Sequence, residues 1–153
     1  MDASVRQADS ADADAVGRLL HDFNTEFEDV TPGPERLAER VVELIAGGET
    51  VVLLAGDGPD GLAVLRFRRS IWTPGLECYL AELYVAPAQR GRGLGRALME
   101  AAVELARERG ADYIDLVTGE DDRAARSLYE SLGFDSSAGK AGGPVNLYYE
   151  REL

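Results

Sequence analysis

A glycine-rich segment between a strand-like run and a helix-like run constrains the fold of this chain more than any other feature. Residues 83–98 read LYVAPAQRGRGLGRAL, so an apolar run stops at Pro87 and Gly91, Gly93 and Gly95 follow at alternate positions. Glycine adopts left-handed turns and places no Cβ atom between the backbone and a ligand. N–H groups at the start of the next helix lie at the positive end of its dipole, which favours phosphate. The segment therefore predicts an anion cradle, although a tight turn that merely tolerates glycine would have the same spacing.

Two common phosphate-binding motifs do not fit this segment. A Walker loop needs lysine and then serine or threonine after its last glycine, and here Gly95 is followed by Arg96 and Ala97. A dinucleotide fingerprint, Gly-x-Gly-x-x-Gly, fails because Arg96 stands where the third glycine belongs. The sequence thus argues against a P-loop NTPase and against a Rossmann oxidoreductase.

Length and charge restrict the class of protein further. A chain of 153 residues has the length of one domain, so we expect a single domain over residues 1–153. Sixteen basic residues against 28 acidic ones give a net charge of −12, which argues against nucleic acid as a partner. One cysteine, no leader-like start and no long apolar run predict a cytoplasmic protein that neither is exported nor binds a membrane.

Hydrophobic periodicity predicts an α/β fold with a mixed sheet. Helical spacing is found at about 10–28, 34–46, 94–109 and 122–132, each run bounded by capping residues, proline or glycine. Apolar, β-branched runs predict strands at 3–7, 50–55, 62–70, 76–85, 112–117 and 145–153. The expected architecture is a central mixed sheet of about six to seven strands flanked by about four helices.

A second segment strengthens the interpretation of the glycine loop. Residues 121–134, DDRAARSLYESLGF, place Asp122, Ala125, Tyr129, Gly133 and Phe134 at fixed spacing on a predicted helix. Together with the glycine loop, this pattern resembles the GNAT superfamily of acyl-CoA-dependent N-acyltransferases, over nearly the whole chain. The resemblance departs at Asp122, where many relatives have asparagine, so a contact with the cofactor's pantetheine arm and a helix N-cap are both open roles.

The resemblance implies a cofactor and a reaction. The cofactor would be acetyl-CoA, bound without any metal, and the reaction would be acetyl transfer to a primary amine of a small molecule or peptide by direct attack in a ternary complex. The expected cofactor-binding residues are Leu83, Tyr84, Val85, Arg90, Gly91, Arg92, Gly93, Leu94, Gly95, Arg96 and Asp122. Two alternatives are a non-catalytic acyl-CoA-binding regulator of the same fold and a structural module with an accidental glycine turn. Family analogy also suggests a homodimer.

Two side chains are the candidates for catalysis. By the resemblance, Tyr129 stands at the position of the family's proton donor, and a phenol can donate a proton to a departing thiolate. Without the motif, we would interpret Tyr129 as a tyrosine packed in the core. Glu82 is expected on the same face of the predicted central strand 76–85 as Cys78, Leu80 and Tyr84, where burial would raise its pKa and suit it to act as a base. A carboxylate paired with an arginine or exposed at a sheet opening is the alternative for Glu82.

The acceptor side has weaker signals. In the family, acceptors enter over the first two helices and the loop between the third and fourth strands, which makes Phe27, Glu28 and Trp72 candidates for lining an acceptor pocket. A surface loop anchored by one tryptophan is the alternative. Cys78 is expected to pack in the core, and one histidine with one cysteine does not make a metal site.

Overall fold

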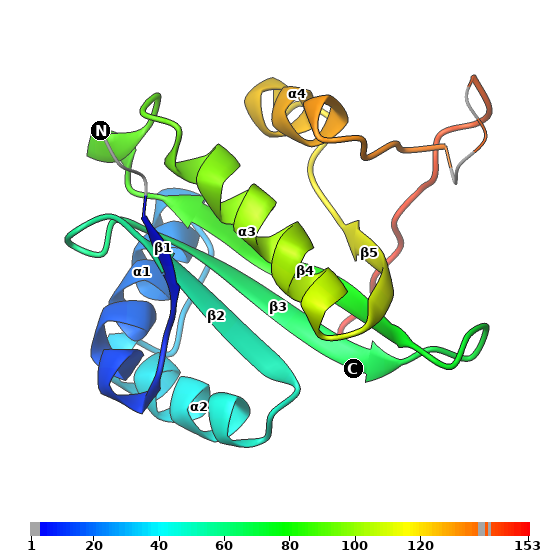
Figure 1. Ribbon diagram of the computed structural model, residues 1–153. Coiled ribbons are helices and arrows are strands. Elements are labelled where there is room, and N and C mark those ends of the chain that lie inside the picture. The colour runs from blue at the N-terminus through cyan, green and yellow to red at the C-terminus, as the bar shows by residue number, and fades with distance from the viewer. Residues whose placement is uncertain (1–3, 138–139, 141) are drawn as a thin grey trace. The chain divides into compact units, whose positions relative to one another are not determined.

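The computed structural model describes residues 4–137, 140 and 142–153, and divides into two compact units at 1–116 and 117–153. The first unit contains a five-stranded sheet and three α-helices (Figure 1). The second unit contains one α-helix and the C-terminal residues. A mixed α/β fold is thereby confirmed, with fewer strands in the described residues than predicted.

The sheet follows the chain without rearrangement, in the order β1-β2-β3-β4-β5. Neighbouring strands are antiparallel from β1 to β4, and β5 runs parallel to β4 after a helical crossover. The strands are β1 (Val5–Gln7), β2 (Thr50–Ala55), β3 (Gly61–Arg69), β4 (Leu76–Val85) and β5 (Ala111–Leu116). β2 and β3 are the apolar runs of the sequence, and every residue of β2 is buried.

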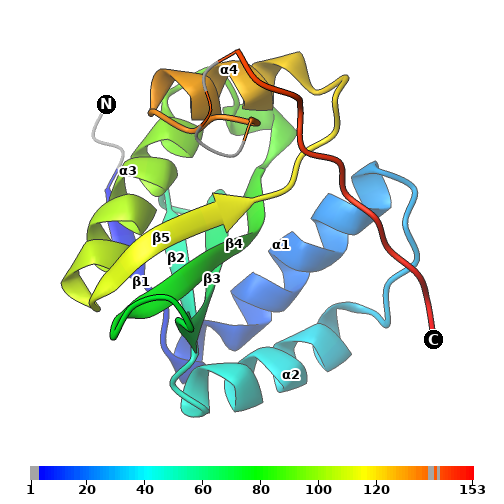
Figure 2. The ribbon, with the colours of Figure 1, turned by 90° about the vertical axis from the view of Figure 1, so that its right-hand side faces the viewer.

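Helices cover both faces of this sheet (Figure 2). α1 (Ala13–Glu26) and α2 (Pro34–Ala46) lie on one face, and α3 (Leu94–Glu108) lies on the other. Pro34 begins α2 at the first turn, where a missing N–H costs nothing. A core cluster joins the first two helices to the sheet: Ala8, Val16, Leu19, Val41, Val52, Leu54, Leu62, Val64 and Tyr84.

A β-bulge in β4 corrects one expectation about Glu82. We expected Glu82 on the same strand face as Cys78, Leu80 and Tyr84, because side chains alternate along a regular strand. The register shifts instead: Leu65 lies opposite Leu80, but Val64 lies opposite Glu82, which leaves Ala81 as the extra residue. Glu82 and Tyr84 therefore face α1 and α2, whereas Cys78 and Leu80 face α3.

β4 and β5 separate before β4 ends. Their parallel pairing runs from Leu76 opposite Ala111 to Leu80 opposite Leu116, so residues 81–85 have no partner on β5. Ala86 N–H donates to Asp60 O on the β3 side. Since backbone groups alternate in direction along an antiparallel strand, Leu83 and Val85 direct their N–H and C=O groups away from β3, toward the side that β5 has left.

The second unit contains α4 (Arg123–Ser131) and corrects the prediction of a last strand. Residues 145–153 are neither helix nor strand, and their apolar side chains, including Leu147 and Tyr149, are exposed. Asn146 N–H donates to Ser136 O in this segment. Strand propensity describes how a residue fits a half-buried sheet, and the described residues of this unit contain no other strand for the segment to pair with.

Candidate functional site

The glycine loop has the backbone that a cradle needs. Gly91 and Gly93 have φ of 79° and 84°, the left-handed region, and a Cβ at either would meet no atom within 4 Å. The conformation, rather than crowding inside the protein, therefore requires glycine. Gly93 is the N-cap of α3 without a side-chain cap, and Ala97 N–H is the first to bond back to it, at 3.0 Å. The preceding N–H groups of Leu94 and Gly95 have no helical acceptor.

Arg90, at the start of the loop, is fixed by partners within the first unit. Its Nη2 donates to both carboxylate oxygens of Glu26 at the end of α1, at 2.9 and 2.8 Å, and its Nε donates to Val85 O at 2.9 Å. Arg92 is exposed and has no ion-pair partner among the described residues. The two arginines thus differ: Arg90 holds the loop against α1 and β4, while the Arg92 side chain is exposed to solvent.

Tyr84 packs against α1, and the Arg90 guanidinium lies over its ring, 5.7 Å from the ring centroid. Its ring stacks on Phe23, with centroids 4.9 Å apart, and its hydroxyl donates to Glu26 Oε1 at 3.2 Å. Burial, together with the charge of Glu26, raises the pKa of the Tyr84 phenol. The side chain of Tyr84 is part of the core, so any contact it offers to a ligand at the opening beside β4 comes from its neighbours Leu83 and Val85.

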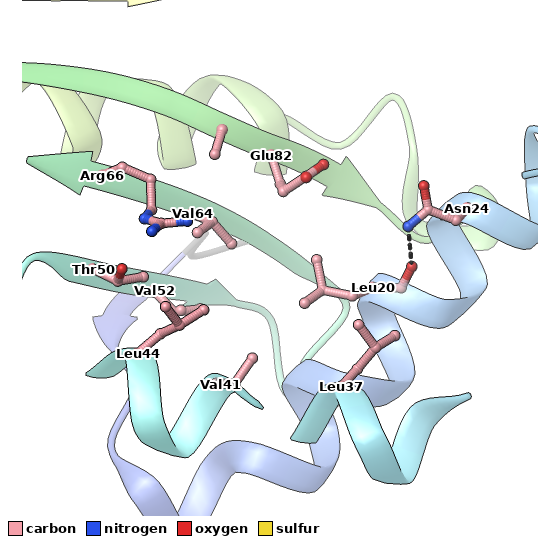
Figure 3. A pocket seen from close by; sticks show the side chains of 11 residues that line it. Leu20, Asn24, Leu37, Val41, Leu44, Thr50, Val52, Val64, Arg66 and Glu82 are labelled. Atoms are coloured by element: carbon pink, nitrogen blue, oxygen red, sulfur yellow. Dashed lines mark hydrogen bonds between the residues drawn. The ribbon is translucent and has the colours of Figure 1, made fainter. Parts of the chain in front are cut away.

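Glu82 lines a pocket of about 160 Å³ between α1, α2 and the sheet (Figure 3). Burial raises the pKa of the Glu82 carboxyl. Its carboxylate forms no hydrogen bond or ion pair with any described residue, so the alternative of an arginine partner does not hold there. The pocket is lined by Leu20, Asn24, Leu37, Val41, Leu44, Thr50, Val52, Val64, Arg66, Ala81 and Glu82. A half-buried, unpartnered carboxylate in a largely apolar pocket is the environment that prepares a general base.

The structure does not bring the three predicted acceptor residues together. Phe27 caps the end of α1, 56% exposed, in edge-to-face contact with Phe23. Glu28 follows it with φ of 62° and is exposed. Trp72 lies 87% exposed in the β3–β4 loop, at the opposite end of β4 from Tyr84 and the end of α1. None of the three lines the pocket that contains Glu82.

The second unit carries the other two predicted site residues on α4. Asp122 is the N-cap, and its Oδ1 accepts from Ala125 N–H at 3.1 Å, as the capping alternative required. Tyr129 is buried on the same helix and lies against Phe134, with ring centroids 6.1 Å apart. Burial and the charge of Asp122 raise the pKa of Tyr129 to about 12. The phenol therefore stays protonated at physiological pH and can act as a hydrogen-bond donor.

Other reactive groups are arranged for packing. Cys78 is fully buried, and burial raises the pKa of its thiol to about 11, so it remains an unreactive thiol. Within the described ranges, no group of three or more potential ligands is placed to hold a metal ion. In the same part of the chain, no helix is both long and apolar enough to cross a bilayer.

Sequence reasoning missed Glu26, Asn24 and Arg66. Glu26 forms an ion pair with Arg90 of the glycine loop. The two residues are far apart in the sequence, so no local pattern predicts that they pair. Asn24 lies one helical turn from Leu20, where it is indistinguishable from an ordinary surface polar residue. Arg66 has a detectable signal, since it interrupts the apolar alternation of β3 on the face that carries Val64.

Comparisons with known proteins agree on one family. A model described as the acetyltransferase (GNAT) family matches residues 15–134, which include both the glycine loop and the α4 motif. A crystal structure described as that of an acetyltransferase from Arthrobacter sp. FB24 is 47% identical, covers 98% of this chain and 96% of its own, and has a TM-score of 0.89. The uncharacterized N-acetyltransferase YhfO of Bacillus subtilis is 27% identical over 89% of this chain and 92% of its own length. The thialysine N-epsilon-acetyltransferase of Bos taurus is 27% identical over 84% and 82%.

Proposed function

Because the chain belongs to the acetyltransferase (GNAT) family, we propose that it transfers an acetyl group from acetyl-CoA to a primary amine of a small molecule or peptide, by direct attack in a ternary complex. The observation that carries the proposal is Glu82, an unpartnered carboxylate with a raised pKa in a pocket next to the opening of the sheet. A non-catalytic regulator of the same fold would have no use for such a group, so we favour an enzyme.

The first unit offers groups that fit acetyl-CoA. The left-handed Gly91 and Gly93, the N–H groups of Leu94 and Gly95 at the start of α3 and the exposed Arg92 suit a pyrophosphate. The backbone N–H and C=O of Leu83, on the side of β4 that β5 has left, suit the amides of pantetheine, which bind an open strand edge as another strand would. When bound, acetyl-CoA supplies the acetyl group as a thioester. Asp122 is occupied as a helix cap, so we assign it no contact with the cofactor.

Glu82 acts as the base. An amine is protonated at neutral pH and attacks only as the neutral form, so one proton must move from nitrogen to the Glu82 carboxylate, directly or through a water. The raised pKa makes this carboxylate a better proton acceptor than an exposed glutamate. In the balanced reaction the C–N bond forms and the C–S bond breaks, the ammonium nitrogen loses two protons, the CoA sulfur gains one, and one proton is released to solvent.

Val85 and Tyr129 serve the two other requirements of acyl transfer. Val85 N–H faces the open side of β4, and we assign it to bind the thioester carbonyl oxygen. Tyr129 carries the family's donor position, and we assign its hydroxyl to donate a hydrogen bond to the departing sulfur. With a pKa of about 12, complete proton transfer from this phenol to a thiolate of ordinary pKa about 8.5 is unfavourable, so the final proton comes from water.

A single experiment tests the enzyme against the regulator. Acetyl-CoA is titrated into the protein by calorimetry, and thiol release is then followed with a panel of amines that includes diamines, aminoglycosides, amino acids and peptides. Binding followed by amine-dependent thiol release is the expected result. Binding without release from any amine would support the regulator, and the absence of binding would remove the cradle interpretation of the glycine loop.

We place the protein in the reducing cytoplasm, in keeping with a buried, unpaired Cys78. We also propose that the protein forms a homodimer, which light scattering across a concentration series would test.

A further inference from the structure

We infer that the acceptor is a zwitterion, in which a primary amine is joined by a short apolar spacer to an anionic group. The amine would lie at Glu82, and the anionic group would lie at Arg66, at the other end of the same pocket. This inference rests on the proposed acetyl transfer, because it assigns the substrate of that site.

The amine end of the pocket offers two oxygen acceptors. Figure 3 shows the Glu82 carboxylate directed toward α1, where Asn24 lies. Asn24 Nδ2 donates to the backbone oxygen of Leu20 at 3.1 Å, which orients the amide and leaves its Oδ1 without a partner among the described residues. An ammonium group has three donors and no acceptor, so it complements a carboxylate and an amide oxygen.

The anionic end is formed by neighbouring residues on β2 and β3. Thr50 lies directly opposite Arg66 in the sheet. Arg66 has no ion-pair partner in the part of the chain that the structure describes, and Thr50, only 5% exposed, uses its hydroxyl in no hydrogen bond there. A guanidinium beside a hydroxyl is a donor pair for a carboxylate or a phosphate, and the guanidinium can bind it in bidentate fashion.

The wall between the two ends is apolar, which limits the spacer. It consists of Leu20, Leu37, Val41, Leu44, Val52 and Val64. Val64 lies opposite Glu82, and Arg66 is two residues further along β3, so the Cα atoms of Arg66 and Glu82 are about 8 Å apart. The pocket volume of about 160 Å³ suits a small molecule, about as large as the cavities that hold benzene. The two charges do not pair with each other in the described residues, since no ion pair or hydrogen bond joins Arg66 to Glu82.

The test compares primary amines that carry an anionic group with primary amines that do not. Thiol release from acetyl-CoA is measured with δ-aminovalerate, with its neutral isostere δ-aminovaleramide, with n-pentylamine and with cadaverine; phosphoethanolamine distinguishes a phosphate from a carboxylate. We expect kcat/KM for δ-aminovalerate or phosphoethanolamine to exceed that of every amine without an anionic group by about tenfold or more. Equal values for δ-aminovalerate and δ-aminovaleramide, with phosphoethanolamine no better, would overturn the inference.

Variants of Arg66 separate this role from folding. Arg66→Gln should lower kcat/KM for the preferred zwitterion by about ten- to a hundredfold and leave n-pentylamine within about twofold. Arg66→Glu should make cadaverine a better substrate than δ-aminovalerate. Arg69→Gln, at an exposed arginine on the opposite face of β3, is the matched control and should change neither. An equal loss for zwitterion and n-pentylamine in Arg66→Gln would contradict the assignment.

A binding measurement keeps this inference distinct from the proposed reaction. If no amine releases thiol, the acetyl transfer proposal fails, and calorimetry with δ-aminovalerate and phosphoethanolamine then decides about the pocket. Binding to the native protein that is lost in Arg66→Gln but kept in Arg69→Gln would support the zwitterion site without turnover. No binding of either probe to the native protein would overturn it.

Discussion

Arg90 and Glu26 form a bidentate ion pair, in which one guanidinium nitrogen donates to both carboxylate oxygens at 2.9 and 2.8 Å. The pair joins the last residue of α1 to the first residue of the glycine loop. Arg90 also holds Val85 O, while Glu26 accepts from the Tyr84 hydroxyl. One carboxylate therefore positions both the loop and the end of β4, the two places at which we expect the cofactor.

Removing this carboxylate should impair use of the cofactor more than folding. Both side chains are partly exposed, at 46% and 28%, so solvent screens the pair and its contribution to stability is about 1 kcal/mol or less. In Glu26→Ala we expect kcat/KM for acetyl-CoA to fall about three- to tenfold, with Tm lowered by only about 2 to 4 °C. Glu26→Gln keeps an acceptor for both partners and should recover part of the loss.

The control for this prediction is Glu104→Ala, which removes an exposed carboxylate 3.8 Å from Arg107 on α3. It should leave the steady-state constants unchanged. An unaltered kcat/KM for acetyl-CoA in Glu26→Ala would mean that the ion pair has no part in positioning the loop.

Glycine at position 93 should be required for two separable reasons. Its φ of 84° is unfavourable for a residue with a Cβ, so Gly93→Ala should cost about 1 to 2 kcal/mol of stability. Gly48 has φ of 81° and equally open surroundings, so Gly48→Ala should cost about as much stability. Calorimetry should show weaker acetyl-CoA binding in Gly93→Ala alone. Equal affinity in the two variants would show that Gly93 only shapes a turn.

Features that depend on a few neighbouring residues are predictable from this sequence, whereas features that depend on distant contacts are not. The glycine loop, the helix caps and the strands from β2 to β5 follow from local rules, because turn chemistry and apolar periodicity act over a few residues. The face of the sheet toward which the Glu82 side chain points does not follow from local rules, because one bulge residue, Ala81, reverses the alternation of side chains along β4. Glu26 was invisible as a site residue for a related reason, because its partner Arg90 comes from a distant part of the chain. Arg66 interrupts the apolar alternation of β3, but the pocket that it lines is formed by segments distant in the sequence.

The C-terminal run illustrates the opposite error. Residues 145–153 have strand-forming composition, yet composition does not supply a partner edge. Trp72 is similar: a large aromatic residue suggests a pocket wall, but it lies exposed at the far end of the β3–β4 hairpin. In both cases the residue type suggests a structural role, but the surrounding structure does not supply the neighbouring strand or the pocket that the role requires.

Tyr129→Phe should separate turnover from cofactor binding. The substitution removes a hydroxyl whose pKa is about 12 and keeps the ring that packs near Phe134. We expect kcat to fall about ten- to a hundredfold while the acetyl-CoA affinity measured by calorimetry stays within about twofold. Tyr113→Phe, at an exposed position on β5, is the matched control. A kcat equal to that of the native protein would remove Tyr129 from the reaction.

Glu82→Gln should reduce activity and raise stability at neutral and alkaline pH. Burial raises the folded-state pKa of Glu82 above its unfolded value, so folding disfavours the charged form. The associated stability is fully present below the unfolded pKa and is lost as pH rises through the folded pKa. The native protein should therefore have a lower Tm than Glu82→Gln at pH 8, and the difference should shrink toward pH 4.

Over the same range, the acidic limb of the pH–kcat/KM profile should belong to Glu82 and vanish in Glu82→Gln, where the residual rate is lower by about a hundredfold. Glu100→Gln, an exposed substitution on α3, should leave both the Tm profile and the rate profile unchanged. An acidic limb that persists in Glu82→Gln would assign the base to a different group, and a Tm that falls at pH 8 would show that the Glu82 carboxylate is stabilised by a partner in solution.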